Sequence, residues 1–121
     1  MRSYQFNAVK APLVAHDGPA PKPGANDVVV QVKAAGICGS DAHIRNGLMV
    51  TSKRPMTLGH EIAGIVTERG ANVTQVDEGE LVVVDYMISC GRCHYCCLGR
   101  DNLCVNGKAI GFDLDGGFAE Y

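Results

Sequence analysis

Residues 90–104 read CGRCHYCCLGRDNLC, and four of their cysteines follow a C-x2-C-x2-C-x7-C spacing. These four are Cys90, Cys93, Cys96 and Cys104. Two residues between neighbouring cysteines let one tight turn aim both sulfur atoms at a common point, and thiolates are soft, charged donors that close a tetrahedral shell around Zn2+. A shell of four sulfur atoms leaves no position for a substrate. The spacing therefore predicts a structural zinc site.

Disulfides and a redox C-x-x-C motif are the alternatives for these cysteines. Disulfides need an oxidising compartment, and residues 1–6 contain no apolar stretch typical of a secretory signal. A redox motif needs two cysteines rather than a spaced run of four. Cys97 lies outside the spacing, and we interpret it as a spare thiol because adjacent residues rarely both reach one metal. We therefore expect a cytoplasmic protein whose cysteines act as thiols or metal ligands.

The composition is that of an ordinary globular protein and argues against two classes of partner. The 121 residues, 46% of them hydrophobic, suffice for one domain with a single core. The formal charge is −2 and the basic residues form no run, which argues against a nucleic-acid surface. No apolar run approaches the length of a bilayer span, since residues 81–88 are interrupted by Asp85. We therefore expect neither nucleic acid nor a membrane as a partner.

The pattern along the chain predicts many short strands, frequent turns and little helix. We expect an edge strand within residues 4–9, a proline-rich loop to about residue 25 and a second loop over residues 48–58. Further strands are predicted at 28–34, 62–68, 81–86, 109–112 and 118–121, with a helical turn near 95–98. One short helix should begin with Ser40 as its N-cap and run to Asn46. Gly64, inside a predicted strand, indicates a close approach of two backbones. The fold class is therefore mainly β and barrel-like.

Cys38, His60 and Glu61 supply one sulfur, one imidazole and one carboxylate. A catalytic zinc site has three protein ligands and one open position, where a bound water or alcohol loses its proton more easily. Taken alone, Cys38 is as well explained as a buried core thiol. The linear pattern does not show whether the three side chains meet.

Three motifs carry a family resemblance, and they occur in that family's order. Residues 59–73, GHEIAGIVTERGANV, match the zinc signature of the medium-chain alcohol dehydrogenases. Residues 36–43, GICGSDAH, resemble the first catalytic-zinc segment in its polyol-dehydrogenase form, and residues 90–104 resemble the structural zinc lobe. Residues 116–121, GGFAEY, are similar to the strand that follows the lobe. The resemblance implies a GroES-like, partly open β-barrel over residues 1–121, with a zinc lobe at about 88–106 and few short helices.

The same resemblance implies roles for individual residues. Cys38 and His60 would bind the catalytic zinc, and Glu61 would be an alternative ligand or lie just behind the ligands. Asp41 would accept a hydrogen bond from the far nitrogen of His60. Ser40 would accept the proton of an alcohol or polyol substrate, unless it only caps the helix. His43 would pass that proton on through the ribose of a bound NAD(P), unless it is only a solvated helix residue.

The sequence departs from the family at its cofactor-binding part. No G-x-G-x-x-G motif occurs, so we expect the Rossmann domain and the third ligand of the catalytic zinc to be absent from this chain. The expected function is that of the N-terminal part of a zinc- and NAD(P)-dependent alcohol dehydrogenase, inactive by itself. Its domain-docking face should be apolar and promote self-association as a homo-oligomer. A freestanding zinc-binding domain with a binding or assembly role is the alternative, and a downstream cofactor motif would distinguish the two.

Overall fold

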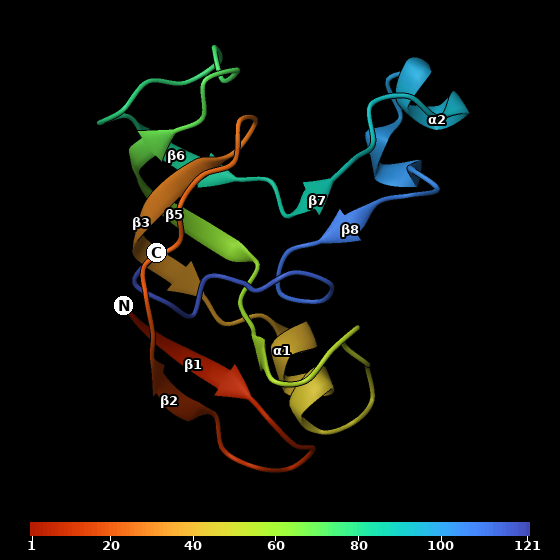
Figure 1. Cartoon of the computed structure of the whole chain (residues 1–121). Coiled ribbons are helices and arrows are strands. Elements are labelled where there is room, and N and C mark those ends of the chain that lie inside the picture. The colour runs from red at the N-terminus through yellow and green to blue at the C-terminus, as the bar shows by residue number, and fades with distance from the viewer.

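The computed structural model describes all 121 residues, and strands dominate it (Figure 1). The elements in order are β1 (Arg2–Phe6), β2 (Val14–Asp17), β3 (Val28–Gly36), α1 (Gly39–Arg45), β4 (Met56–Thr57), β5 (Glu61–Arg69), β6 (Leu81–Val84), β7 (Met87–Ile88), α2 (His94–Cys97), the 3-10 helix η1 (Asp101–Leu103) and β8 (Lys108–Ala109). No helix is long and apolar enough to cross a bilayer. The predicted mainly-β class with few short helices is confirmed.

The strands form three antiparallel sheets. The first has the order β2-β1-β4, the second β3-β5-β6, and the third is the pair β7-β8. The β7-β8 pair leads away from the two larger sheets to a lobe that carries α2 and η1 (Figure 1). We call residues 88–106 the four-cysteine lobe and the β7-β8 pair its base.

Residues 118–120 join the two larger sheets although they form no regular strand. The N–H of Tyr4 donates to the carbonyl of Phe118 at 2.8 Å, and the N–H of Glu120 donates to Arg2 at 2.9 Å. On the other side, the N–H of Val32 donates to the carbonyl of Glu120 at 2.9 Å. The predicted strand at 118–121 is therefore an irregular connection, because its backbone bonds are divided between β1 and β3.

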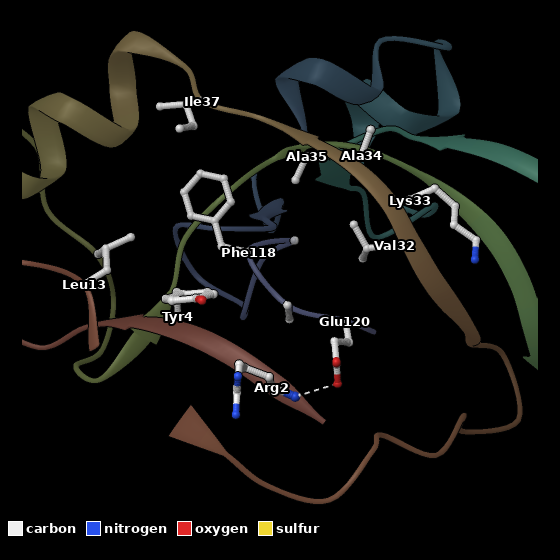
Figure 2. Close-up of a pocket in the computed structure, with 12 residues that line it drawn as sticks. Arg2, Tyr4, Leu13, Val32, Lys33, Ala34, Ala35, Ile37, Phe118 and Glu120 are labelled. Carbon is white, nitrogen blue, oxygen red and sulfur yellow. Dashed lines mark hydrogen bonds between the residues drawn. The ribbon is translucent and has the colours of Figure 1, made fainter. Parts of the chain in front are cut away.

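An open groove of about 510 Å³ lies beside this connection, and Figure 2 shows its lining. Tyr4 and Leu13 border it from one direction, Val32 and Ile37 from the other, and Phe118 lies between them. The Ile37 side chain is strongly exposed, so much of this apolar surface faces solvent. None of the predicted metal ligands lines the groove, and we assign it no part in the chemistry.

The core lies where α1 covers the first sheet. Phe6, Ile44, Met56 and Leu58 are completely or almost completely buried and form one cluster. Burying four large apolar side chains contributes about 6–12 kcal/mol of favourable transfer free energy, against which the ordering of the chain must be set. Because the cluster includes Ile44 of α1, it also holds the helix that follows Cys38.

Three predictions about elements need correction. The first strand is not at an edge, because β2 and β4 pair with both of its sides. Those two strands arise inside the segments predicted as loops, since a two- or four-residue strand needs only a neighbouring backbone and little sequence pattern. The N-cap of α1 is Cys38 rather than Ser40, because the carboxylate of Asp41 accepts a hydrogen bond from the Cys38 N–H. Ser40 is left free to face His60.

Gly64 lies where the backbones of the paired strands β3 and β5 approach closely, as its position inside a predicted strand indicated. A Cβ atom at this residue would lie 2.6 Å from Cγ1 of Val30 and still closer to the carbonyl oxygen of Gln31. We expect Gly64→Ala to lower the free energy of unfolding by at least about 2 kcal/mol, because backbone in a paired sheet cannot move away cheaply. Urea denaturation followed by circular dichroism measures the change.

Gly39→Ala is the matched control, because a Cβ atom there would meet no atom within 4 Å. Gly39 opens α1, where alanine is a better helix former than glycine. We expect this variant to be as stable as the parent or slightly more stable. Equal stability of the two alanine variants would contradict the close approach at Gly64.

Candidate metal centres

The four cysteines of the predicted spacing converge in the lobe. Their sulfur atoms all lie within 4.8 Å of one another. The Cys93 sulfur lies 3.5 Å from that of Cys96 and 3.9 Å from that of Cys104. In a tetrahedron with Zn–S bonds of 2.3 Å, neighbouring sulfur atoms are about 3.8 Å apart. The spacing of the sulfur atoms therefore fits a four-thiolate zinc site.

Local backbone geometry produces this convergence. Gly91 has a positive φ of 68°, which turns the chain between the first two cysteines. Cys93 then becomes the N-cap of α2, and the helix carries Cys96 back towards it. All six cysteines of the chain are free thiols, so the disulfide alternative is not realised.

The hydrogen bonds in the lobe favour ionised sulfur at some positions and oppose it at another. The Arg92 backbone lowers the pKa of Cys90 to about 6, and the Cys96 backbone lowers the pKa of Cys93. Burial first, and then hydrogen bonds that keep the proton on Cys96 beside the Cys93 and Cys104 sulfur atoms, raise the pKa of Cys96 to about 12. Without a cation the cluster therefore holds a mixture of thiolates and thiols, and a divalent ion would favour the ionised form of all four.

The lobe has no apolar core of its own. Neither α2 nor η1 contains a buried residue. Leu98, Leu103 and Val105 are all exposed. Burial of apolar surface therefore cannot account for the order of this segment, and bonds between the four sulfur atoms and a metal ion would supply that stability.

Cys97 stays outside the metal cluster. Its side chain is exposed, and its sulfur lies 3.7 Å from the carbonyl oxygen of Arg92. The four-sulfur group contains the other lobe cysteines without it. This arrangement agrees with the interpretation of Cys97 as a spare thiol.

Cys38, His60 and Glu61 form a second convergent group, as the resemblance led us to expect. Their ligand atoms all lie within 4.8 Å of one another. The pairing of β3 with β5 places Gly36 opposite Glu61, so the two strand ends that carry the group are adjacent. One sulfur, one imidazole and one carboxylate make up a donor set that suits Zn2+. The residues present therefore fit a second zinc ion.

The two ring nitrogens of His60, Nδ1 and Nε2, have different surroundings. Nε2 lies 3.3 Å from the hydroxyl oxygen of Ser40. Nδ1 is the one buried side-chain nitrogen or oxygen in the chain that has no hydrogen-bond partner. It lies 3.8 Å from Oδ1 of Asp41, which is longer than a hydrogen bond. The hydrogen bond expected between His60 and Asp41 is therefore not made in this structure.

Asp41 instead connects the two segments that carry the ligands. Its Oδ2 accepts from the Cys38 N–H at 2.9 Å, and its Oδ1 accepts from the Gly59 N–H at 3.3 Å. The side chain is only 5% exposed. Because Gly59 immediately precedes His60, one buried carboxylate links the backbone at both ligands.

The remaining predicted residues are more open to solvent. His43 lies in the last turn of α1 with an exposed side chain, and its ring makes no hydrogen bond. Glu61 is also exposed, and its carboxylate lies over Gly36 in space that a side chain at residue 36 would occupy. The structure brings Glu61 to the group with Cys38 and His60, whereas no hydrogen bond links His43 to Ser40.

Tyr86 and Phe112 contact the ring of His60, and the sequence analysis did not identify them. The ring centroids are 5.6 Å apart for Tyr86 and 5.1 Å apart for Phe112. Both residues lie far from His60 in sequence, and neither belongs to a metal-ligand spacing. The one feature of the sequence that could have indicated them is their position next to the two short strands, β7 and β8, that flank the lobe.

The family is decided by a comparison of this chain with known domains. Residues 24–121 match the alcohol dehydrogenase GroES-like domain. The chain belongs to the zinc-containing medium-chain alcohol dehydrogenases. Its strand-rich, partly open fold is the GroES-like fold predicted from the sequence.

The curated relatives of this chain include proteins named as alcohol dehydrogenases and threonine dehydrogenases. The NAD-dependent alcohol dehydrogenase of Sulfurisphaera tokodaii is 39% identical over an alignment that covers 100% of this chain and 37% of that protein. The L-threonine 3-dehydrogenase of Caldanaerobacter subterraneus is 44% identical over 84% of this chain and 30% of that protein. The chain therefore spans about a third of the length of the relatives it matches.

Solved structures of family members agree with the fold over nearly the whole chain. A cobalt- and zinc-bound thermostable alcohol dehydrogenase from Pyrobaculum aerophilum superposes with a TM-score of 0.91 and 34% sequence identity. The superposition covers 99% of this chain and 37% of that one. The common fold therefore includes both candidate metal centres.

Proposed function

We propose that this chain is the N-terminal, metal-binding part of a cytoplasmic zinc- and NAD(P)-dependent dehydrogenase of alcohols or polyols. The convergence of Cys38, His60 and Glu61 beside Ser40, separate from the four-cysteine lobe, carries the proposal. Family membership supports it, because the curated relatives oxidise alcohols or threonine by their names. Residues 1–121 would form an incomplete GroES-like catalytic domain that includes the lobe at about 88–106.

The side chains at the second group have distinct tasks in this reaction. Cys38 and His60 would hold a catalytic zinc, with Glu61 as an alternative ligand or as a group behind the ligands. That ion supplies electrostatic stabilisation of the developing alkoxide. Asp41 sets the relative position of Cys38 and His60 through their backbones.

Proton transfer would use Ser40 and His43. The Ser40 hydroxyl lies next to the His60 ring and is placed to accept the proton of a substrate alcohol. His43, which is exposed and at the end of the same helix, would pass the proton towards solvent. No hydrogen bond joins the two side chains, and His43 would be the residue of this chain that contacts the nucleotide when it is bound.

Hydride transfer needs a nicotinamide next to the substrate carbon. In a full-length enzyme, the nucleotide would bind to a region outside these 121 residues. That region would correspond to the two thirds of the relatives' length that this chain does not match. We therefore expect the 121-residue chain by itself to reduce no NAD(P)+. A longer reading frame that encodes G-x-G-x-x-G after residue 121 would supply the missing part.

Cys38→Ala tests the two-site assignment. We expect the purified chain to bind two zinc ions and the variant to bind one, because the lobe keeps its four thiolates. In a longer product that contains the nucleotide domain, the same variant should lose at least about 1,000-fold in kcat/KM for NAD(P)+-dependent alcohol oxidation. Mass-spectrometric metal analysis and NAD(P)H absorbance measure the two effects.

Cys97→Ser is the control, since Cys97 belongs to neither metal group. It should keep both zinc ions. Loss of all zinc from Cys38→Ala alone would show that the two groups do not bind independently. A Cys38→Ala enzyme with unchanged activity would contradict the catalytic role.

A further inference from the structure

The ring of His60 has few polar contacts to hold it. Its side chain is 10% exposed, Nδ1 has no hydrogen-bond partner, and Nε2 has only the contact of 3.3 Å with Ser40. A histidine that binds a metal normally has its second nitrogen fixed by a hydrogen bond. Contacts other than hydrogen bonds must therefore set the orientation of this ring.

Two aromatic rings provide those contacts. Phe112 meets the His60 ring at a centroid distance of 5.1 Å with planes inclined by 46°. Tyr86 meets it at 5.6 Å with planes inclined by 59°. Both distances lie within the range of favourable aromatic pairs. Together they restrict rotation of the imidazole about its bond to Cβ.

Both aromatic residues are attached to the base of the four-cysteine lobe. Tyr86 directly precedes β7, and Phe112 follows β8 by three residues. The Ile110 N–H donates to the carbonyl of Tyr86 at 2.9 Å, which ties the two segments together above the β7-β8 pairing. The order of the lobe base is thereby connected to the position of the His60 ring.

Residues 52–53, in the loop before β4, form a third segment that contacts the backbone around Phe112. The Ser52 N–H donates to the Phe112 carbonyl at 2.9 Å, and Lys53 pairs with Asp115 at 2.6 Å. Phe112 also packs against the main core cluster. Phe112 is therefore held between the core and the lobe base, with its ring against His60.

We propose that Phe112 and Tyr86 are positioning residues that orient His60 for metal binding and make the affinity of the Cys38/His60 group depend on an ordered lobe. This inference rests on the proposed function, because it assumes that Cys38 and His60 bind a metal. Phe112 has the larger effect on the orientation of the His60 ring. It lies closer to His60 and is less exposed than Tyr86.

Cobalt titration of Phe112→Leu tests the proposal. The chain is first loaded with one equivalent of Zn2+ to fill the lobe and is then titrated with Co2+, so that new cobalt–thiolate absorption reports on Cys38. We expect Phe112→Leu to weaken Co2+ binding at this group by about tenfold or more, as removal of outer-sphere support commonly does. Phe112→Tyr should restore most of the affinity, because it keeps the ring.

Phe118→Leu is the matched control. Phe118 packs against the same core cluster as Phe112 but makes no ring contact with His60. It should change Co2+ affinity by less than about threefold, within the scatter expected for a purely structural change. Tyr86→Leu, at a more exposed residue, provides a second variant if Phe112→Leu does not fold by circular dichroism.

The lobe dependence has its own measurement. The Cys93→Ser variant cannot close the four-sulfur shell. Compared with the parent chain, it should bind Co2+ at Cys38 and His60 about tenfold more weakly. Unchanged affinity in the aromatic variants, or an equal loss in Phe118→Leu, would overturn the positioning role. Absence of cobalt–thiolate absorption in the zinc-loaded parent chain would instead overturn the proposed function.

Discussion

Cys93→Ser is expected to unfold the four-cysteine lobe while the two larger sheets stay folded. The lobe has no buried residue in α2 or η1, so its order depends on the metal–sulfur bonds. Zinc at about 100 times its Kd stabilises the bound form by about 2.7 kcal/mol, which corresponds to a factor of about 100 in the population of the open form. The lobe should therefore open about 100 times more often in the variant.

Limited trypsin digestion measures this opening, because Arg92 and Arg100 lie inside the lobe and are exposed. Cleavage at these two arginines should become about 100-fold faster in Cys93→Ser. Amide hydrogen exchange at Phe6 and Val66, in the buried sheets, should change little. Cys97→Ser should digest like the parent. Equal resistance of Cys93→Ser would contradict a metal-dependent lobe.

Asp41→Ala is expected to lower the free energy of unfolding by about 3 kcal/mol. The buried carboxylate accepts hydrogen bonds from the Cys38 and Gly59 N–H groups, and its removal leaves both donors without a partner. Each unsatisfied buried donor costs about 1–3 kcal/mol. The same change should release the backbone at both ligands, so zinc should also be lost from the Cys38/His60 group.

Asp17→Ala is a suitable comparison for this variant. Asp17 also accepts a charged hydrogen bond, but its partner is the exposed Arg2 on the surface, at 3.2 Å. An exposed pair of this kind contributes little to the free energy of unfolding, because solvent and salt screen it. Urea denaturation and metal analysis of both variants give the result. If Asp41→Ala and Asp17→Ala had the same free energy of unfolding, the Asp41 carboxylate would not be what holds the Cys38 and His60 segments together.

Short-range features of this protein could be predicted from its residues. The C-x2-C-x2-C-x7-C spacing closes within fifteen residues, so the turn at Gly91 and the start of α2 at Cys93 bring the sulfur atoms together locally. Gly64 likewise indicated a close approach of two backbones, which occurs between the paired strands β3 and β5. Local geometry and residue type were sufficient in both cases.

Features that depend on distant neighbours were predicted less well. An edge strand was expected within residues 4–9, but the strand that forms there, β1, pairs on both sides with β2 and β4. Ser40 has the residue type of an N-cap, but Cys38 takes that position because Asp41 reaches back to its N–H. Short strands and caps of this kind are decided by which backbone lies nearby rather than by propensity.

The residues alone predicted the class of the fold and the spacing that brings four sulfur atoms together in the lobe, and the family resemblance named Cys38, His60 and Glu61 as the second candidate group. Only the tertiary structure decided that Cys38 meets His60, because the register that pairs Gly36 with Glu61 is a contact between distant segments. It also decided that Tyr86 and Phe112 lie against His60. Local conformation follows from neighbouring residues, whereas contacts between remote segments follow from the register in which the strands pair.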